Sequence, residues 1–202
     1  MTKKEAISII SRCSSLYESN LCGRQLVFVY RDNANRLRFV EVTFRANNFM
    51  HFTGMDTAKD MKAKEFYRSA IDKRLKESDI VFRADHTAEL KLHILPNIMN
   101  IAYSARMIGD YTGPHIELYT EKVTGTTTAC LGLIKNGCEY IPNTILKEDI
   151  RDLTPKPPGK IFAILRKQIS QSMYSEITYQ SKGLKITRSS FPTELHTKLD
   201  IF

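Results

Sequence analysis

The side chain best suited to catalysis in this chain is His51, in the segment Asn48-Phe49-Met50-His51-Phe52-Thr53-Gly54. Histidine exchanges protons near neutral pH, which makes it the commonest general acid or base. A strand pattern precedes the segment and a helical pattern follows it. We therefore expect His51 where a strand passes into a loop, held rigidly and within reach of solvent. The alternative is a structural histidine, partly buried in a turn with one ring nitrogen hydrogen bonded.

Metal-free RNA cleavage is a reaction that ordinary side chains can perform. RNA supplies its own nucleophile, the 2′-hydroxyl. The protein must supply a base, an acid and cations that stabilise the pentavalent phosphate. Any basic globular protein carries such side chains, so their presence alone does not single out this chemistry. Here the candidates are His51, Tyr119, Lys122, Arg166, Tyr174, Ser175 and Thr178.

Strong local patterns precede His51 and determine its expected position. A capping box at the N-terminus, followed by apolar residues at helical spacing, predicts a helix over residues 3–21. A β-branched and aromatic run at 25–30, turn residues at 32–35 and a second run at 37–44 predict a hairpin. This hairpin leads directly to His51.

More helix is expected between residues 57 and 108. Residues 57–77 combine an apolar stripe with a very basic face, which either follows a phosphate backbone or is simply solvated. A short strand is expected at 80–82. Apolar spacing favours a helix over 87–108, kinked or broken at Pro96, and the alternative is a strand at 88–94 followed by a helix at 96–108.

The second half of the chain has mainly β-patterns. A loop at 109–114 precedes expected strands at 116–122, 127–135 and 139–141, with a hairpin turn at Asn136-Gly137. A mixed segment at 143–153 and a connector at 154–159 follow. An antiparallel pair at 160–167 and 174–179, extended by 183–187, and a short helix from Phe191 are expected last. This order predicts an α+β fold, with helices segregated from an antiparallel sheet.

Composition restricts the function classes. The chain has 202 residues, which we expect to form one domain with a C-terminal tail at about 184–202, and it has no apolar run of membrane-spanning length. The amphipathic N-terminus is not typical of a signal peptide, so we expect a soluble, cytoplasmic protein. The net charge of +8 attracts phosphate backbones and acidic proteins alike. None of the four cysteines has zinc-site spacing, and we expect them to be reduced.

Several familiar catalytic motifs are missing from the sequence. It contains no Walker loop, no Gly-x-Gly-x-x-Gly, no nucleophile elbow and no His-Glu-x-x-His. We therefore expect neither a cofactor nor a metal. The pattern of a helix-turn-helix is also missing, which argues against a plain DNA-binding module.

Six segments together resemble a phage-associated nuclease-like family, the fourth of the groups named for barnase, EndoU, colicin and RelE. The resemblance extends from the first helix to about Lys182. It implies N-terminal helices with a curved antiparallel sheet, an active site on the concave face, metal-independent cleavage of tRNA or mRNA, and an origin in Gram-positive bacteria and their mobile elements. The segments are Asn48–Gly54, Leu95–Asn100, Met107–Tyr111, Leu118–Lys122, Pro142–Arg151 and Tyr174–Tyr179.

From the matching segments and the residues' chemistry we assign roles as hypotheses. His51 is the expected base or acid, and Lys122 and Arg166 are expected to stabilise the phosphate. Tyr119, Tyr174, Ser175 and Thr178 are candidates for proton transfer or substrate positioning, although the tyrosines also suit cross-strand packing.

The leading hypothesis from the sequence is a metal-independent endoribonuclease of phage or mobile-element origin, acting as a toxin on RNA. A protein antitoxin or a defence-system protein is the expected partner. The rival hypothesis is a non-catalytic binding or inhibitor protein on the same fold, acting in phage–host conflict. The enzyme requires His51 and at least one cation to converge, whereas the binder requires only an exposed patch.

Overall fold

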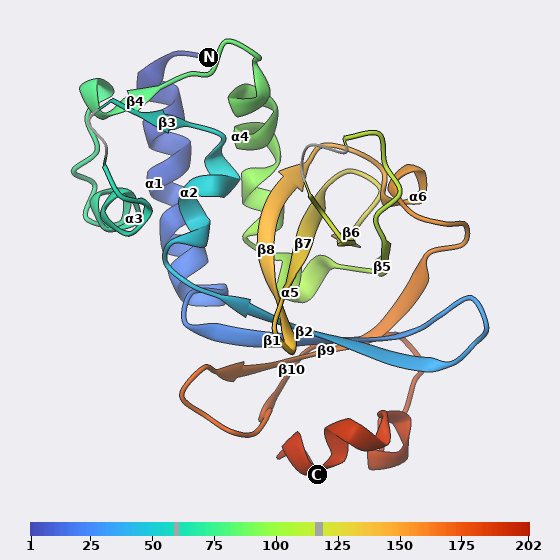
Figure 1. Ribbon diagram of the computed structural model, residues 1–202. Coiled ribbons are helices and arrows are strands. Elements are labelled where there is room, and N and C mark those ends of the chain that lie inside the picture. The colour runs from blue at the N-terminus through green and yellow to red at the C-terminus, as the bar shows by residue number, and fades with distance from the viewer. Residues whose placement is uncertain (59–60, 116–118) are drawn as a thin grey trace.

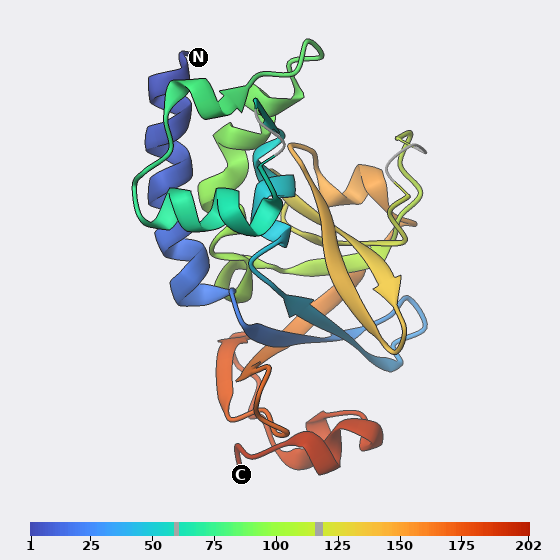
Figure 2. The same ribbon diagram turned by 60° about the vertical axis from the view of Figure 1, so that its left-hand side comes forward.

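Helices and sheet occupy separate parts of the molecule, as expected for an α+β fold. The computed structural model describes residues 1–58, 61–115 and 119–202. The helical part lies at the N-terminal end, and the strands curve beneath and beside it (Figure 1). A view turned by 60° shows the same separation, with the C-terminal segment on the far side of the sheet from α1 (Figure 2).

The first helix and hairpin match their sequence patterns closely. Helix α1 spans Lys3–Asn20, and its N-terminus is closed by the predicted capping box between Thr2 and Glu5. Strands β1 (Arg24–Arg31) and β2 (Leu37–Phe44) pair in register from end to end. This stiff hairpin places the start of the His51 segment at a fixed point on the sheet.

The strands form one curved sheet whose pairings close on themselves. The order is β1-β2-β8-β7-β6-β5-β9-β10, and β9 also pairs with β1. The β2–β8 pairing is parallel, through Val42 and Tyr140, whereas the other strand pairings of this sheet within the described residues are antiparallel. The remaining strands are β5 (Met107–Asp110), β6 (Lys122–Gly125), β7 (Cys130–Asn136), β8 (Glu139–Leu146), β9 (Gly159–Gln168) and β10 (Glu176–Gln180).

Short helices and a small second sheet complete the helical part. Strands β3 (Asp56–Thr57) and β4 (Ile80–Val81) pair beside α2 and α4, and β4 confirms the short strand expected there. The α-helices are α2 (Asn48–Thr53), α3 (Ala63–Ile71), α4 (Thr87–Ile98), α5 (Ile101–Ser104) and α6 (Ile150–Leu153). The 3₁₀ helices are η1 (Glu77–Asp79), η3 (Arg188–Ser190) and η4 (Thr193–Lys198), the last in place of the helix expected from Phe191.

Several expected boundaries are wrong. The helix expected at 57–77 is the shorter α3, because Thr57 pairs in β3 and the helix ends at Ile71. Residues 107–110 form β5, so the helix expected through Ile108 ends early, and the alternative strand at 88–94 is part of α4. Residues 119–121 and 183–187 contain no strand, whereas 116–118 lie outside the described residues.

Three groups of buried side chains hold the layers together. The largest group joins the five helices α1, α2, α3, α4 and α5 to the inner faces of β1, β2, β7 and β8. The second covers the outer faces of β1 and β9 with Phe191, Leu195 and Leu199 of the C-terminal segment. The third packs α6 against β6 and β7. Helix α2, which carries His51, is therefore held between the largest group of buried side chains and strand β8.

Candidate active site at the junction of α2, α4 and β8

His51 lies on the exposed side of α2, a helix whose other side is fully buried. Phe49 and Phe52 are completely buried, and both rings pack on Tyr17 of α1, with centroids 5.3 and 5.9 Å away. The expected strand-to-loop position for His51 is therefore wrong. The aromatic residues around it fold the segment into a short helix because they anchor one face in the core. His51 is on the face that remains exposed.

Two contacts fix α2 against its neighbours. Asn48 accepts a hydrogen bond from the Arg45 amide at 2.8 Å and donates one to the Pro142 carbonyl of β8 at 3.4 Å. At the other end, Gly54 has φ +67°, and a Cβ there would lie 3.0 Å from both Ala88 Cα and Lys91 Cδ. Glycine therefore permits both the left-handed turn and the close approach of α4. That approach brings Lys91 to α2.

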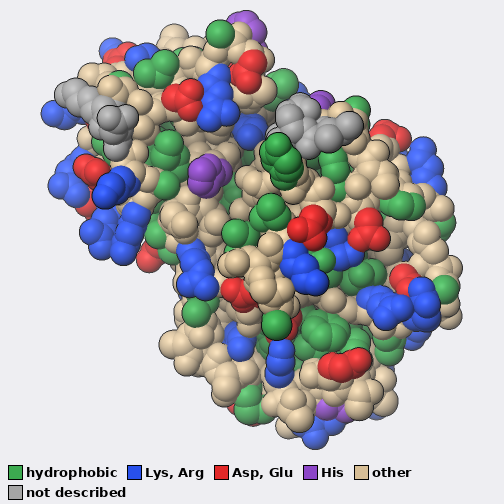
Figure 3. Space-filling view, in the orientation of Figure 1, with side chains coloured by type: hydrophobic (Ala, Val, Ile, Leu, Met, Phe, Trp, Pro, Cys, Tyr) green, Lys and Arg blue, Asp and Glu red, His purple; other side chains and the backbone are tan. Residues whose placement is uncertain are grey.

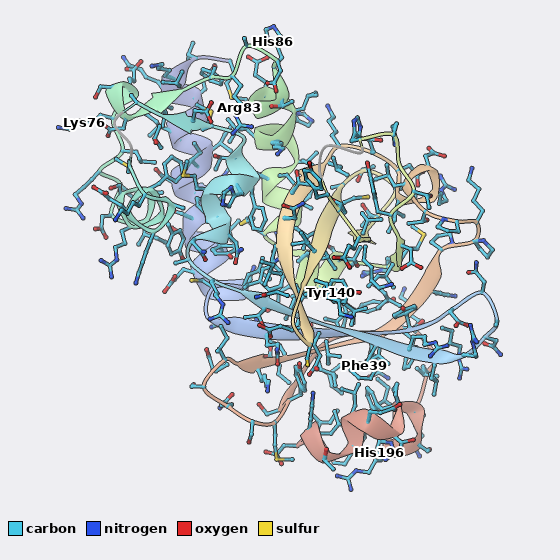
Figure 4. The ribbon with its side chains drawn as sticks, viewed as in Figure 1. Phe39, Lys76, Arg83, His86, Tyr140 and His196 are labelled. Carbon is cyan, nitrogen blue, oxygen red and sulfur yellow. The ribbon has the colours of Figure 1, made fainter. Side chains whose placement is uncertain are left out.

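Two cations act on His51 at this junction. Lys91 donates to Thr144 Oγ1 of β8 at 3.1 Å, and Arg83 pairs with Asp56, Nη2 to Oδ1, at 2.8 Å. Arg83 lies beside the β3–β4 pair and α4 (Figure 4). In the space-filling view, cationic side chains and a histidine border the junction of the helical part and the sheet (Figure 3).

The electrostatics of the junction favour a neutral imidazole. Loss of water around the ring lowers the pKa of His51, and the charges of Lys91 and Arg83 lower it further. Within the described part of the chain, the ring makes no hydrogen bond. His51 is thus available at neutral pH to accept a proton. Burial, followed by the charge of Arg83, also lowers the pKa of Lys91, so its ammonium is a stronger acid than an exposed lysine.

Sequence reasoning missed Lys91, Arg83 and Thr144. Lys91 was detectable, because it lies three residues after Ala88 and four before Leu95, on the buried face of its helix. A lysine on an apolar face is uncommon unless it has a partner or a function. Arg83 and Thr144 have no comparable signal, since only the tertiary fold brings β4 and β8 to α2.

Lys122 and Arg166 lie elsewhere, each opposite a carboxylate in a sheet. Lys122 pairs in register with Asp110 and donates a hydrogen bond to it. Arg166 pairs in register with Glu176 through two hydrogen bonds of 2.7 and 2.8 Å. Burial opposes the protonated form in both, but the bonded carboxylate prevails and raises the pKa. The structure does not bring these two cations to the His51 junction.

Tyr174 is a buried member of a half-buried polar network on the outer face of β1 and β2. Its hydroxyl lies 2.9 Å from Glu41 Oε1 and 3.0 Å from Gln25 Oε1. Lys198 donates to Glu41 at 2.8 Å, and Gln25 donates to Glu139 at 2.7 Å. Burial and the Glu41 charge raise the pKa of Tyr174, which holds its proton. We call these residues, with Thr43, the Glu41 network.

The other three predicted residues are also dispersed. Tyr119 is 78 % exposed, with φ +49°, beside residues outside the described part. Ser175 is exposed, next to buried Tyr174. The Thr178 hydroxyl donates to the Ala102 carbonyl at 2.6 Å and lies 3.2 Å from the Ile164 carbonyl. Thr178 thus joins α5 to β9 and β10. His51 alone of the predicted set is at the junction.

The described ranges contain neither a metal-binding cluster nor a membrane-spanning helix. In residues 1–58, 61–115 and 119–202, no three His, Cys, Asp or Glu side chains gather where they could hold a metal ion. In the same ranges no helix has the length and hydropathy needed to cross a bilayer. All four cysteines are free thiols.

The fold defines a class, an α+β protein with a curved sheet, and a histidine lies beside two cations at the junction. A family model places the chain among nuclease-like proteins. The chain belongs to the phage-Barnase-EndoU-ColicinE5/D-RelE like nuclease4 family, whose model matches residues 9–183. No curated protein and no solved structure matches the chain.

Proposed function

We propose that this protein is a metal-independent endoribonuclease whose active site is the junction of His51, Lys91 and Arg83. The observation that supports it most directly is the lowered pKa of an exposed histidine beside two cations. A neutral imidazole is a base, and cations attract the phosphate that must approach it. Membership of a nuclease-like family supports the same reaction class.

The proposed reaction is attack of the RNA 2′-hydroxyl on its own 3′-phosphate. His51 takes the proton of the hydroxyl as the O2′–P bond forms. Lys91 and Arg83 stabilise the negative charge of the pentavalent phosphate. The P–O5′ bond then breaks, and the leaving oxygen takes a proton from the acidic Lys91 ammonium. The products are a 2′,3′-cyclic phosphate and a 5′-hydroxyl.

A cleavage assay tests this proposal. Purified protein and its His51→Ala variant are incubated with total bacterial RNA in EDTA, and the product ends are mapped. The proposal expects discrete cuts with 2′,3′-cyclic phosphate ends from the wild type and none from the variant. Intact RNA in both samples, or equal cutting by both, would overturn it. Lys64→Ala, on the exposed face of α3, is the matched control.

The family description also supports a role in phage biology. In this proposal the cytoplasmic enzyme acts as a toxin encoded by a phage or mobile element, and a protein antitoxin restrains it. Expression of the wild type should then stop bacterial growth, and expression of the His51→Ala variant should not. Equal growth with both proteins would separate RNA cleavage from toxicity.

The rival function is a non-catalytic binding or inhibitor protein. The observation in its favour is that Lys122 and Arg166 are already paired with Asp110 and Glu176. A binder would retain affinity for its partner when His51 is replaced by alanine, and wild-type protein would leave RNA intact.

A further inference from the structure

A large cavity lies away from the His51 junction. It has a volume of about 1110 Å³ and is bounded by the β1–β2 turn, the start of β5, the connector before β9 and residues 181–190. The turn is at the opposite end of β2 from α2. Strand β2 has eight residues, which spans about 25 Å at the usual rise per residue. This cavity is therefore distinct from the proposed active site, and we call it the hairpin cavity.

Five cations line the hairpin cavity, against one carboxylate among the described lining residues. They are Arg31, Arg106, Arg151, Lys160 and Lys182. Within the described residues, Lys160 and Lys182 have no ion-pair partner, whereas Arg151 pairs with Asp149. The one carboxylate among the described lining residues, Asp32, is held by Arg36 and Arg38 at 2.9 and 3.2 Å. The excess positive charge favours an anionic ligand.

A smaller slot adjoins the hairpin cavity, and its lining combines Tyr30, Ile108 and three prolines with two cation–carboxylate pairs, Arg36–Asp32 and Lys122–Asp110. The slot has a volume of about 290 Å³ and shares Asp32, Asn33 and two of these prolines with the larger cavity. The ring of Tyr30 lines it and lies over Gly159, where a Cβ would come within 2.5 Å of the ring. A slot beside an aromatic ring suits a flat base, because bases stack on such rings.

We infer that the hairpin cavity and its slot bind a single-stranded RNA segment as a second contact region for the substrate. Phosphates lie along Lys160, Lys182 and Arg31, and one base enters the slot beside Tyr30. An acidic peptide without aromatic side chains would use the cations but has no flat group for the slot. The inference rests on the proposed function for its substrate. Leu184, Ser189 and Ser190 of the wall lie beyond the family match, so the site is built partly by this chain's own C-terminal segment.

Salt-dependent binding of a short RNA tests the charged part of the site. The protein carries His51→Ala so that the RNA stays intact, and affinity for a 12-nucleotide single strand is measured from low to high salt. Each lost phosphate contact lowers the slope of log K against log salt by about 0.7. The double variant Lys160→Gln/Lys182→Gln should therefore lose about 1.4 in slope and roughly tenfold in affinity at low salt.

The matched control removes the same charge from another surface. Lys64→Gln/Lys76→Gln alters the α3 region, far from His196 of the C-terminal segment (Figure 4). The inference requires the slope to stay unchanged in this variant. Equal losses in both double variants would show diffuse attraction to net charge and overturn the site. An unchanged slope in the Lys160/Lys182 variant would overturn it as well.

Tyr30→Leu tests the slot by a readout that charge does not affect. Stacking is independent of salt to first order, so affinity should fall roughly tenfold while the slope stays constant. Affinity equal to that of the parent would overturn the slot. Displacement of the RNA by polyglutamate but not by a competing oligonucleotide would overturn the ligand class.

The outcomes separate this inference from the proposed function. Wild-type protein that cleaves RNA, with a Lys160/Lys182 variant of unchanged slope, would refute the second contact region alone. Wild-type protein that binds RNA through the hairpin cavity without cleaving it would refute the ribonuclease proposal alone.

Discussion

The His51 junction and the Glu41 network are both clusters of polar side chains. They differ in whether the central side chain is hydrogen bonded within the protein. In the Glu41 network, Tyr174, Gln25 and Lys198 all bond to carboxylates within the network. At the junction, His51 has two cations nearby, and no ring hydrogen bond is found among the described residues. A satisfied buried network stabilises a structure, whereas an unsatisfied, accessible group is available to a ligand.

The two regions also differ in burial. Tyr174 is fully buried beneath the C-terminal segment, which pairs with it through a bridge to Leu199. His51 is on the exposed face of α2. Substitutions in the Glu41 network should therefore change stability and leave cleavage unaltered, whereas substitutions at the junction should do the reverse.

The largest expected effect is on cleavage by His51→Gln. Loss of a general base lowers the rate by about 10²- to 10⁴-fold. The melting temperature should stay close to that of the wild type, because an exposed side chain away from packing contributes less than about 0.5 kcal/mol. Single-turnover cleavage measures the rate, and thermal unfolding measures the melting temperature. A large fall in melting temperature with an unchanged cleavage rate would show that His51 has a structural role and not a catalytic one.

The Lys91→Met variant tests the electrostatic role of Lys91 at the His51 junction. Removing the ammonium should lower the cleavage rate by about 10²-fold, as for loss of a transition-state donor. It also removes a positive charge that lowers the pKa of His51, so that pKa rises. Cleavage needs the neutral ring and is lost as pH falls through this pKa. The acid limb of the pH–rate profile should therefore move to higher pH, and a shift to lower pH would contradict the proposed geometry.

The sequence predicted an element correctly where the interactions that form it are local in the chain. Helix α1 and the β1–β2 hairpin follow from capping, periodicity and turn residues, all of which are local. Helix α2 was missed because it has six residues and no side-chain cap, and buried aromatic side chains stabilise it instead. Short elements of this kind depend on tertiary packing that one local window does not contain.

The candidate site shows the same limit. His51 was found from residue type alone, and the lysine on the apolar face of α4 was available as a signal. Lys122 and Arg166 were chosen for their charge, but their opposite partners depend on strand register. Register fixes which side chains face each other across a sheet. Lys91, which bonds to the Thr144 hydroxyl and not to a carboxylate, is the better candidate for phosphate binding.

Tyr174→Phe tests the Glu41 network with a smaller expected effect. The ring remains and the hydroxyl is lost, so Glu41 keeps Lys198 as a donor while Gln25 Oε1 loses the donor Tyr174. Stability should fall by about 1–2 kcal/mol, the usual range for one buried hydrogen bond. Urea unfolding measures it, with His51→Gln as the matched control. Cleavage should be unaffected, and a rate loss at full stability would place Tyr174 in the active site.

Ser175→Ala should have the smallest effect. Ser175 is exposed beside Tyr174, and within the described chain its hydroxyl makes no hydrogen bond. An exposed serine of this kind contributes less than about 0.5 kcal/mol to stability. The rate should stay within twofold of wild type because the side chain is outside the His51 junction. A large loss of cleavage with unchanged unfolding would move the chemistry to the β9–β10 edge, where Arg166 and Thr178 also lie, and the assignment to His51 would then fail.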